Sequence, residues 1–107
     1  MTGPASSLTL LAIIPDSETL ALTLEQANSR GLSVVTAQDP QAALMMADMA
    51  LPDIVITDLF LPEHTGLTLV QEIHNRFPNT AIIVSAGTAD GQTVIEAMRA
   101  GGTDYLP

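Results

Sequence analysis

Short apolar runs alternate with segments of helical spacing along this chain. Four runs rich in β-branched residues are expected to form strands: residues 8–14, 33–37, 53–57 and 81–85. A fifth, weaker candidate is the run 104–106. Polar residues seldom interrupt these runs, which is typical of parallel strands that are covered on both faces.

The segments between the runs carry apolar residues at helical spacing, together with signals for where a helix begins. Asp16 or Ser17 can cap the first helix, because their side chains accept hydrogen bonds from exposed N–H groups. Asp39 followed by Pro40 marks the start of the second, and Asp90 can cap the fourth. The strict alternation of strand and helix favours right-handed crossovers and an open parallel sheet. We therefore expect an α/β fold with five strands and four helices.

Composition limits the classes of partner and compartment. The 107 residues suffice for one domain, and three Arg, no Lys and 12 acids give a net charge of −9. Such a charge repels nucleic acid and anionic lipid, so neither is expected as a direct partner. The absence of Cys excludes disulfides and thiolate zinc sites and favours a reducing cytoplasm. The apolar run 8–14 is far too short for a membrane anchor, and no signal peptide precedes it.

Two further features concern the start of the chain and its methionines. Residues 1–7 are small and polar without apolar periodicity, and we interpret them as a flexible leader before a domain spanning 8–107. Most of the five methionines are expected to fill the core. Met45 and Met46 are adjacent, so both cannot face the core, and one should lie at a rim. A partner-binding role for that residue is the alternative to plain exposure.

The candidate chemistry centres on Asp58, which directly follows Val55-Ile56-Thr57. In open α/β sheets the functional crevice lies beyond the carboxyl ends of the strands. A carboxylate at that edge can act as a nucleophile toward phosphoryl groups or as a ligand for a hard cation. A capping or loop role is the alternative on position alone.

Three stretches of sequence carry a family resemblance. Residues 53–66 (DIVITDLFLPEHTG) place a Pro four residues and a Gly eight residues after Asp58. Residues 97–107 (AMRAGGTDYLP) contain a Gly, an Asp-Tyr pair and a Leu-Pro pair, and residues 30–37 (RGLSVVTA) look like a turn and a second strand. Over residues 8–107 the chain resembles the CheY-like receiver domain of two-component response regulators. The resemblance implies a flavodoxin-like, doubly wound sheet in the order 2-1-3-4-5, with the family's last helix missing from the chain.

The resemblance also implies a function in phosphorelay signal transduction. Asp58 would take a phosphoryl group from a histidine kinase or a phosphotransfer protein, and the domain would relay this to an output domain beyond Pro107. The module itself would not be an enzyme, and family members also form homodimers. Such a site needs two acids after the first strand, a Ser or Thr after the fourth, a Lys after the fifth and one Mg²⁺. Here the implied ligands of Mg²⁺ are Asp58, Asp16 and the backbone carbonyl of Phe60, which predicts weak binding.

The acid positions depart from the family pattern. An ungapped alignment places Ile14 and Pro15 there, and neither side chain can ligate a metal. A one-residue slip in the first helix would bring Asp16 onto the ligating position. The alternative role for Asp16 is that of a helix cap.

The hydroxyl and aromatic positions are those that would report phosphorylation in the family. The ungapped alignment places Ala86 at the hydroxyl position, with Ser85 one residue before it. Since strand side chains alternate between faces, Ser85 would point away from the site unless a bulge intervenes. Tyr105 stands at the aromatic switch position, and with Ala86 beside it we predict that Tyr105 keeps one orientation. The chain stops at Pro107, before the position of the Lys, and we expect the full-length protein to continue.

Two other interpretations remain at this point. Ile14, Pro15 and Ala86 support a degenerate receiver that acts as a protein-interaction module without phosphoryl chemistry. A phosphatase or phosphomutase with Asp58 as nucleophile is the alternative from the enzyme class. That chemistry generally uses a second acid two residues later, where this chain has Phe60.

Overall fold

The computed structural model describes residues 8–58, 60–61, 64–85 and 91–106, so the predicted leader at residues 1–7 lies outside the described part. Five parallel strands form one sheet in the order β2-β1-β3-β6-β7. Their bounds are Thr9–Ile13 (β1), Ser33–Thr36 (β2), Ile54–Asp58 (β3), Ala81–Ser85 (β6) and Asp104–Leu106 (β7). This order confirms the predicted doubly wound α/β fold.

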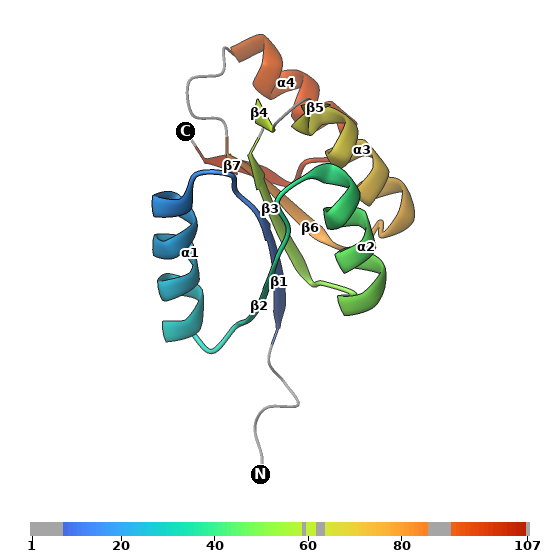
Figure 1. The fold of residues 1–107 in the computed structure, drawn as a ribbon. Helices are drawn as coiled ribbons and strands as arrows, with labels where there is room; N and C mark the ends of the chain where they lie inside the picture. The colour runs from blue at the N-terminus through green and yellow to red at the C-terminus, as the bar shows by residue number, and fades with distance from the viewer. Residues whose placement is uncertain (1–7, 59, 62–63, 86–90, 107) are drawn as a thin grey trace.

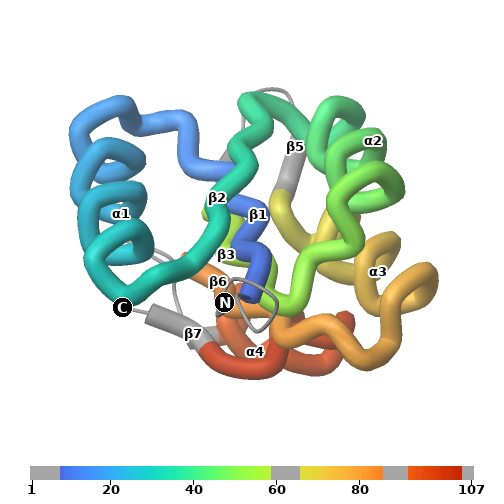
Figure 2. The backbone as a smooth tube through the Cα atoms, turned by 90° about the horizontal axis from the view of Figure 1, so that it is seen from below, coloured from blue at the N-terminus to red at the C-terminus, as the bar shows by residue number. Residues whose placement is uncertain are grey.

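Four helices connect the strands and lie on both sides of the sheet. They are α1 (Ser17–Ser29), α2 (Pro40–Ala50), α3 (Gly66–Arg76) and α4 (Gly91–Ala100). Helix α1 lies on one face, while α2, α3 and α4 lie on the other (Figures 1 and 2). The predicted caps Asp16 and Asp39 are confirmed, since each carboxylate accepts a hydrogen bond from a backbone N–H three residues later, at 2.8 Å. Asp90 lies outside the described residues. None of the helices in the described ranges is long and apolar enough to cross a bilayer.

The core lies between the sheet and the three helices on its second face. Its buried members are Leu11, Ile13, Ala37, Ala43, Ala47, Val55, Leu69, Val70, Ile73, Ile82, Val84 and Ala97. On the first face, β1 is fully covered, but β3 and β6 alternate between buried and half-buried residues. The expectation that every strand is covered on both faces is therefore wrong for β3 and β6, and also for the edge strand β2, whose residues are exposed or half-buried. Within the described residues α1 alone packs on that side, and an apolar groove of about 330 Å³ between α1 and the sheet reaches Leu10, Leu22 and Ile56.

Polar side chains at the strand starts fix the register. Asp53 accepts a hydrogen bond from the N–H of Thr9 (2.8 Å) on its carboxylate and donates its own N–H to the Thr9 carbonyl (2.9 Å). Thr103 binds the main chain of Ile82 in the same two-sided way, through its hydroxyl (2.9 Å) and its N–H (2.7 Å). These contacts hold β3 against β1 and β7 against β6. A one-residue slip in either pair would break both bonds.

Two features were not predicted. A short antiparallel pair, β4 (Phe60–Leu61) and β5 (His64–Thr65), follows β3, and two-residue strands are too short to leave a periodic pattern.

The methionines of α2 do not all lie in the core. Met45 and Met49 are 61% and 77% exposed, whereas Met46 packs against the core, which confirms that one of Met45 and Met46 lies at a rim. Alanines occupy the buried side of this helix, so it approaches the sheet closely without large side chains.

Candidate functional site at the carboxyl edge of the sheet

Asp58 is the last residue of β3, between β1 and β6 in the middle of the sheet. The β1 residue Ile13 pairs with Thr57, and the β6 residue Ser85 pairs with Asp58. The carboxyl ends of three neighbouring parallel strands therefore meet at the level of Asp58. This is the edge at which open α/β sheets carry their functional crevice.

The pairing of Asp58 with Ser85 also decides which face their side chains share. Residues paired in register in a parallel sheet project to the same side. Asp58 and Ser85 are both half-buried, whereas the preceding pair, Thr57 and Val84, is completely buried on the opposite face. The structure thus places Ser85 beside Asp58, without the bulge that sequence reasoning required. Ala86 lies outside the described residues, so its place at the site stays untested.

The end of β1 offers apolar side chains where the family resemblance calls for acids. One step beyond the Ile13 and Thr57 pair, Ile14 comes level with Asp58, and it is only 4% exposed. Pro15 follows and is half-buried. The low exposure of Ile14 indicates a packing role, and it leaves this part of the edge without a carboxylate.

Asp16 serves as the N-cap of α1. Its carboxylate accepts hydrogen bonds from the Thr19 hydroxyl (2.5 Å) and the Thr19 N–H (2.8 Å). These two bonds lower the pKa of Asp16, and the hydroxyl has the larger effect because it binds the charged form most closely. The capping role weighed for Asp16 is therefore confirmed.

The described donors fit a divalent cation only in part. Mg²⁺ is held by oxygen ligands in near-octahedral geometry, and carboxylates supply most of its affinity. Across the described ranges, no group of three or more His, Asp or Glu side chains is placed to hold a metal ion. Of the implied ligands, Asp58 stands at the edge, while Asp16 would have to give up its bonds to Thr19. Within the described residues, one of the two implied carboxylate ligands is therefore engaged in capping α1.

Two neighbouring residues complete the edge. The buried Thr57 donates its hydroxyl to the Asp58 carbonyl at 3.1 Å, which steadies the backbone as the chain leaves β3. Tyr105 of β7 pairs with Val84 of β6, so β6 lies between Tyr105 and the strand that ends at Asp58, and the Tyr105 side chain is outside the described part. The sequence predicted that Asp58 ends a central strand, which the structure confirms, and the strand pairing adds Ser85 as its neighbour. The switch role of Tyr105 stays a prediction.

Comparisons with known proteins identify the family and the fold. Residues 11–107 match the family model of the response regulator receiver domain. The transcriptional regulatory protein KdpE of Mycobacterium tuberculosis is 32% identical over 100 residues, which cover 92% of this chain and 44% of KdpE. The DNA-binding transcriptional regulator NtrC of Klebsiella pneumoniae is 29% identical over 96 residues, or 89% of this chain. The chain spans about a fifth (20%) of the length of NtrC.

Solved structures share the fold over nearly the whole chain. The chemotaxis response regulator CheY4 of Vibrio cholerae superposes with a TM-score of 0.86 at 23% identity, covering 94% of this chain and 86% of CheY4. A response regulator receiver domain protein from Clostridium thermocellum gives a TM-score of 0.85 at 29% identity, covering 92% of this chain and 80% of that protein.

Proposed function

The chain belongs to the response regulator receiver domain family, and on this premise we propose that Asp58 accepts a phosphoryl group and that the domain relays this event to an output domain. The observation that carries the proposal is the pairing of Asp58 with Ser85 at the carboxyl edge. This pairing joins a nucleophilic carboxylate to a hydroxyl that can bind a phosphoryl oxygen.

The proposed reaction is a transfer between two side chains. A carboxylate oxygen of Asp58 attacks the phosphorus of a phosphohistidine, so that a P–O bond forms while the P–N bond breaks. The imidazole of the donor leaves and takes up a proton from solvent. The product is an acyl phosphate on Asp58, and the Ser85 hydroxyl donates a hydrogen bond to one of its oxygens.

Charge limits how well this site holds the product. The phosphoryl group adds negative charge to a chain of net charge −9 that contains no Lys. We propose that Mg²⁺ binds weakly beside Asp58 and offsets part of that charge when present. The steps above involve only Asp58, Ser85 and the phosphodonor.

The proposed partners follow from the chemistry and from the relatives. A histidine kinase or a phosphotransfer protein supplies the phosphoryl group, in the cytoplasm. The output is a separate or attached domain, as the relatives named DNA-binding or transcriptional regulators are longer than this chain. The acidic receiver itself does not contact DNA.

Incubation with a small phosphodonor and Mg²⁺, followed by intact mass measurement, tests the proposal. We expect one added phosphoryl group in the wild type, removable by hydroxylamine, and none in Asp58→Asn. Asp53→Asn is the matched control, because Asp53 lies at the opposite end of β3 and an amide oxygen can still bind the Thr9 N–H.

Three results would contradict the proposal. An unmodified wild-type chain would favour a phosphorylation-independent interaction module. An adduct that persists in Asp58→Asn would place the acceptor elsewhere. Turnover of the donor without a stable adduct would favour an enzyme.

A further inference from the structure

Helix α2 turns large apolar side chains toward solvent. Met45 and Met49 are 61% and 77% exposed, and Leu51, the residue after the helix, is 66% exposed. Met45 and Met49 are four residues apart, so they lie one above the other on the outer side of the helix. The inner side is made by Ala43 and Ala47, which are completely buried. We call Met45, Met49 and Leu51 the α2 surface.

Leu51 takes part in this surface at a conformational cost. It closes α2 in the left-handed region (φ 49°, ψ 62°) and donates its N–H to the Ala47 carbonyl at 2.9 Å. Among the described non-glycine residues, no other has a positive φ. Glycine or asparagine usually occupies this position, because other L-residues are strained there. A leucine is thus held in an unfavourable conformation with its side chain largely in solvent.

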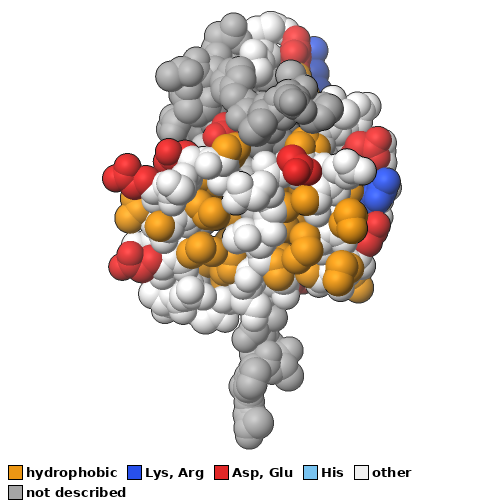
Figure 3. Space-filling view, in the orientation of Figure 1, with side chains coloured by type: hydrophobic (Ala, Val, Ile, Leu, Met, Phe, Trp, Pro, Cys, Tyr) orange, Lys and Arg blue, Asp and Glu red, His pale blue; other side chains and the backbone are white. Residues whose placement is uncertain are grey.

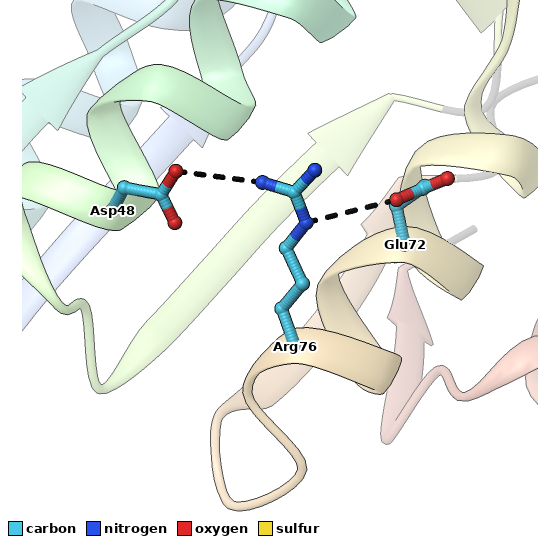
Figure 4. Close-up of polar contacts among 3 residues, drawn as sticks. All are labelled: Asp48, Glu72 and Arg76. Carbon is cyan, nitrogen blue, oxygen red and sulfur yellow. Dashed lines mark hydrogen bonds and ion pairs between the residues drawn. The ribbon is translucent and has the colours of Figure 1, made fainter.

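The α2 surface adjoins a group of acids. Asp48 of α2 and Glu72 of α3 both bind the guanidinium of Arg76, at 3.4 and 3.7 Å, so two carboxylates share one cation (Figure 4). All three side chains remain about half exposed. Apolar side chains gather over α2 at the right of the space-filling view, next to acidic and basic groups (Figure 3). The surface is therefore apolar, with a border of two carboxylates and one guanidinium whose summed charge is negative.

We propose that the α2 surface docks a cationic amphipathic helix of a partner protein. The methionines four residues apart match an apolar stripe at helical spacing, and their flexible thioethers can repack against different side chains. Basic residues beside that stripe would pair with Asp48 and Glu72. A second copy of this chain fits less well, because both copies carry a charge of −9 and would bring carboxylates together. The proposal does not depend on phosphoryl transfer to Asp58.

Two designed peptides test the proposal. One is an amphipathic helix with a leucine stripe flanked by lysines, and the other carries glutamates in place of the lysines. Titration into isotope-labelled protein should give saturable amide shifts along α2 and at Leu51 with the lysine peptide and none with the glutamate peptide. The double variant Met45→Gln/Met49→Gln should raise the Kd at least about tenfold, which corresponds to about 1.4 kcal/mol.

Leu22→Gln is the matched control, since Leu22 is a 59% exposed leucine on α1, on the other face of the sheet. Leu22→Gln should leave the Kd for the lysine peptide unchanged. The proposal is overturned if the shifts map to the groove beside α1, if the glutamate peptide binds equally, or if the double variant keeps its affinity. A concentration-dependent dimer that the double variant abolishes would instead make a second copy the occupant.

Discussion

His74 occupies the space that a side chain at position 101 would need. A Cβ on Gly101 would lie 2.5 Å from both the Cβ and the Cγ of His74, closer than non-bonded carbons approach. Gly101 also has a φ of 131°, which L-residues rarely adopt. Gly101 lies in the turn between α4 and β7 and faces His74 of α3. Glycine is therefore required there for two independent reasons, the lack of space and the positive φ.

The variant Gly101→Ala is expected to lower the free energy of unfolding by about 2 kcal/mol or more, since it adds a clash to an unfavourable φ. Gly31→Ala is the control, because Gly31 has a φ of 79° but no atom within 4 Å of its added Cβ. It should cost about 1 kcal/mol. Urea denaturation of both variants measures the difference. Equal losses would show that His74 is not an obstacle.

The cap at Asp16 predicts a dependence of stability on pH. The pKa of Asp16 in the folded chain lies below its ordinary value of 3.8, because Thr19 binds the carboxylate. The charged cap therefore stabilises the fold above pH 3.8, and its contribution is lost as pH falls through the lowered pKa. Asp16→Asn keeps a capping oxygen but not the charge, so the wild type should exceed it in stability at neutral pH and lose this advantage in acid. Thr19→Val should raise the pKa of Asp16 in an NMR titration, and an unchanged value would contradict the assigned cause.

The neighbour relationship of Asp58 and Ser85 predicts which residue responds to phosphorylation. A hydroxyl bound to a charged phosphoryl oxygen contributes about 1.5–3 kcal/mol, enough to shift the end of β6. Because Ser85 pairs with Asp58, we expect, in contrast to the prediction from the sequence alone, that phosphorylation changes the amide signals of β6 and the ring environment of Tyr105 in the wild type. Both changes should fall by more than half in Ser85→Ala. If Ala86 occupies the hydroxyl position, as the ungapped alignment has it, Tyr105 will keep one environment and Ala86→Thr will be the variant that introduces the change.

The apolar end of β1 predicts that Mg²⁺ affinity can be increased. Pro15→Asp would add a carboxylate beside the edge that carries Asp58, and we expect the Kd for Mg²⁺ to fall on the order of tenfold, or about 1.4 kcal/mol. Pro15→Ala is the control for loss of the ring and should leave the Kd unchanged. Calorimetric titration gives both values. A wild type that already binds as tightly as Pro15→Asp would mean that Asp16 or another donor completes the site.

The architecture was predictable because local signals agree with the global fold. The β-branched runs, the caps at Asp16 and Asp39 and the strict alternation all indicate the same sheet. The position of Asp58 followed from the same rule, since it ends a central strand. Pairing register was not predictable in this way. An alignment counts residues along one strand, whereas the level of Ser85 depends on how β6 slides against β3.

The exposed methionines show a second limit of sequence reasoning. An apolar residue in a helix is usually assigned to the core, and α2 contains both large and small apolar residues. Alanines lie on the inner side of α2, because the helix approaches the sheet too closely for larger side chains. Apolarity alone cannot distinguish the two sides when nearly every position is apolar.

The position of β1 between β2 and β3 has a consequence for the synthesis of the chain. Thr9 of β1 bonds to Asp53 at the start of β3, 44 residues later in the sequence. A ribosome adds about 5–20 residues per second, so several seconds pass between the emergence of these two strands. During that interval one side of the most buried strand has no partner in the nascent chain. The order of strands thus leaves one apolar edge of β1 unpaired in an early translation product until β3 has emerged.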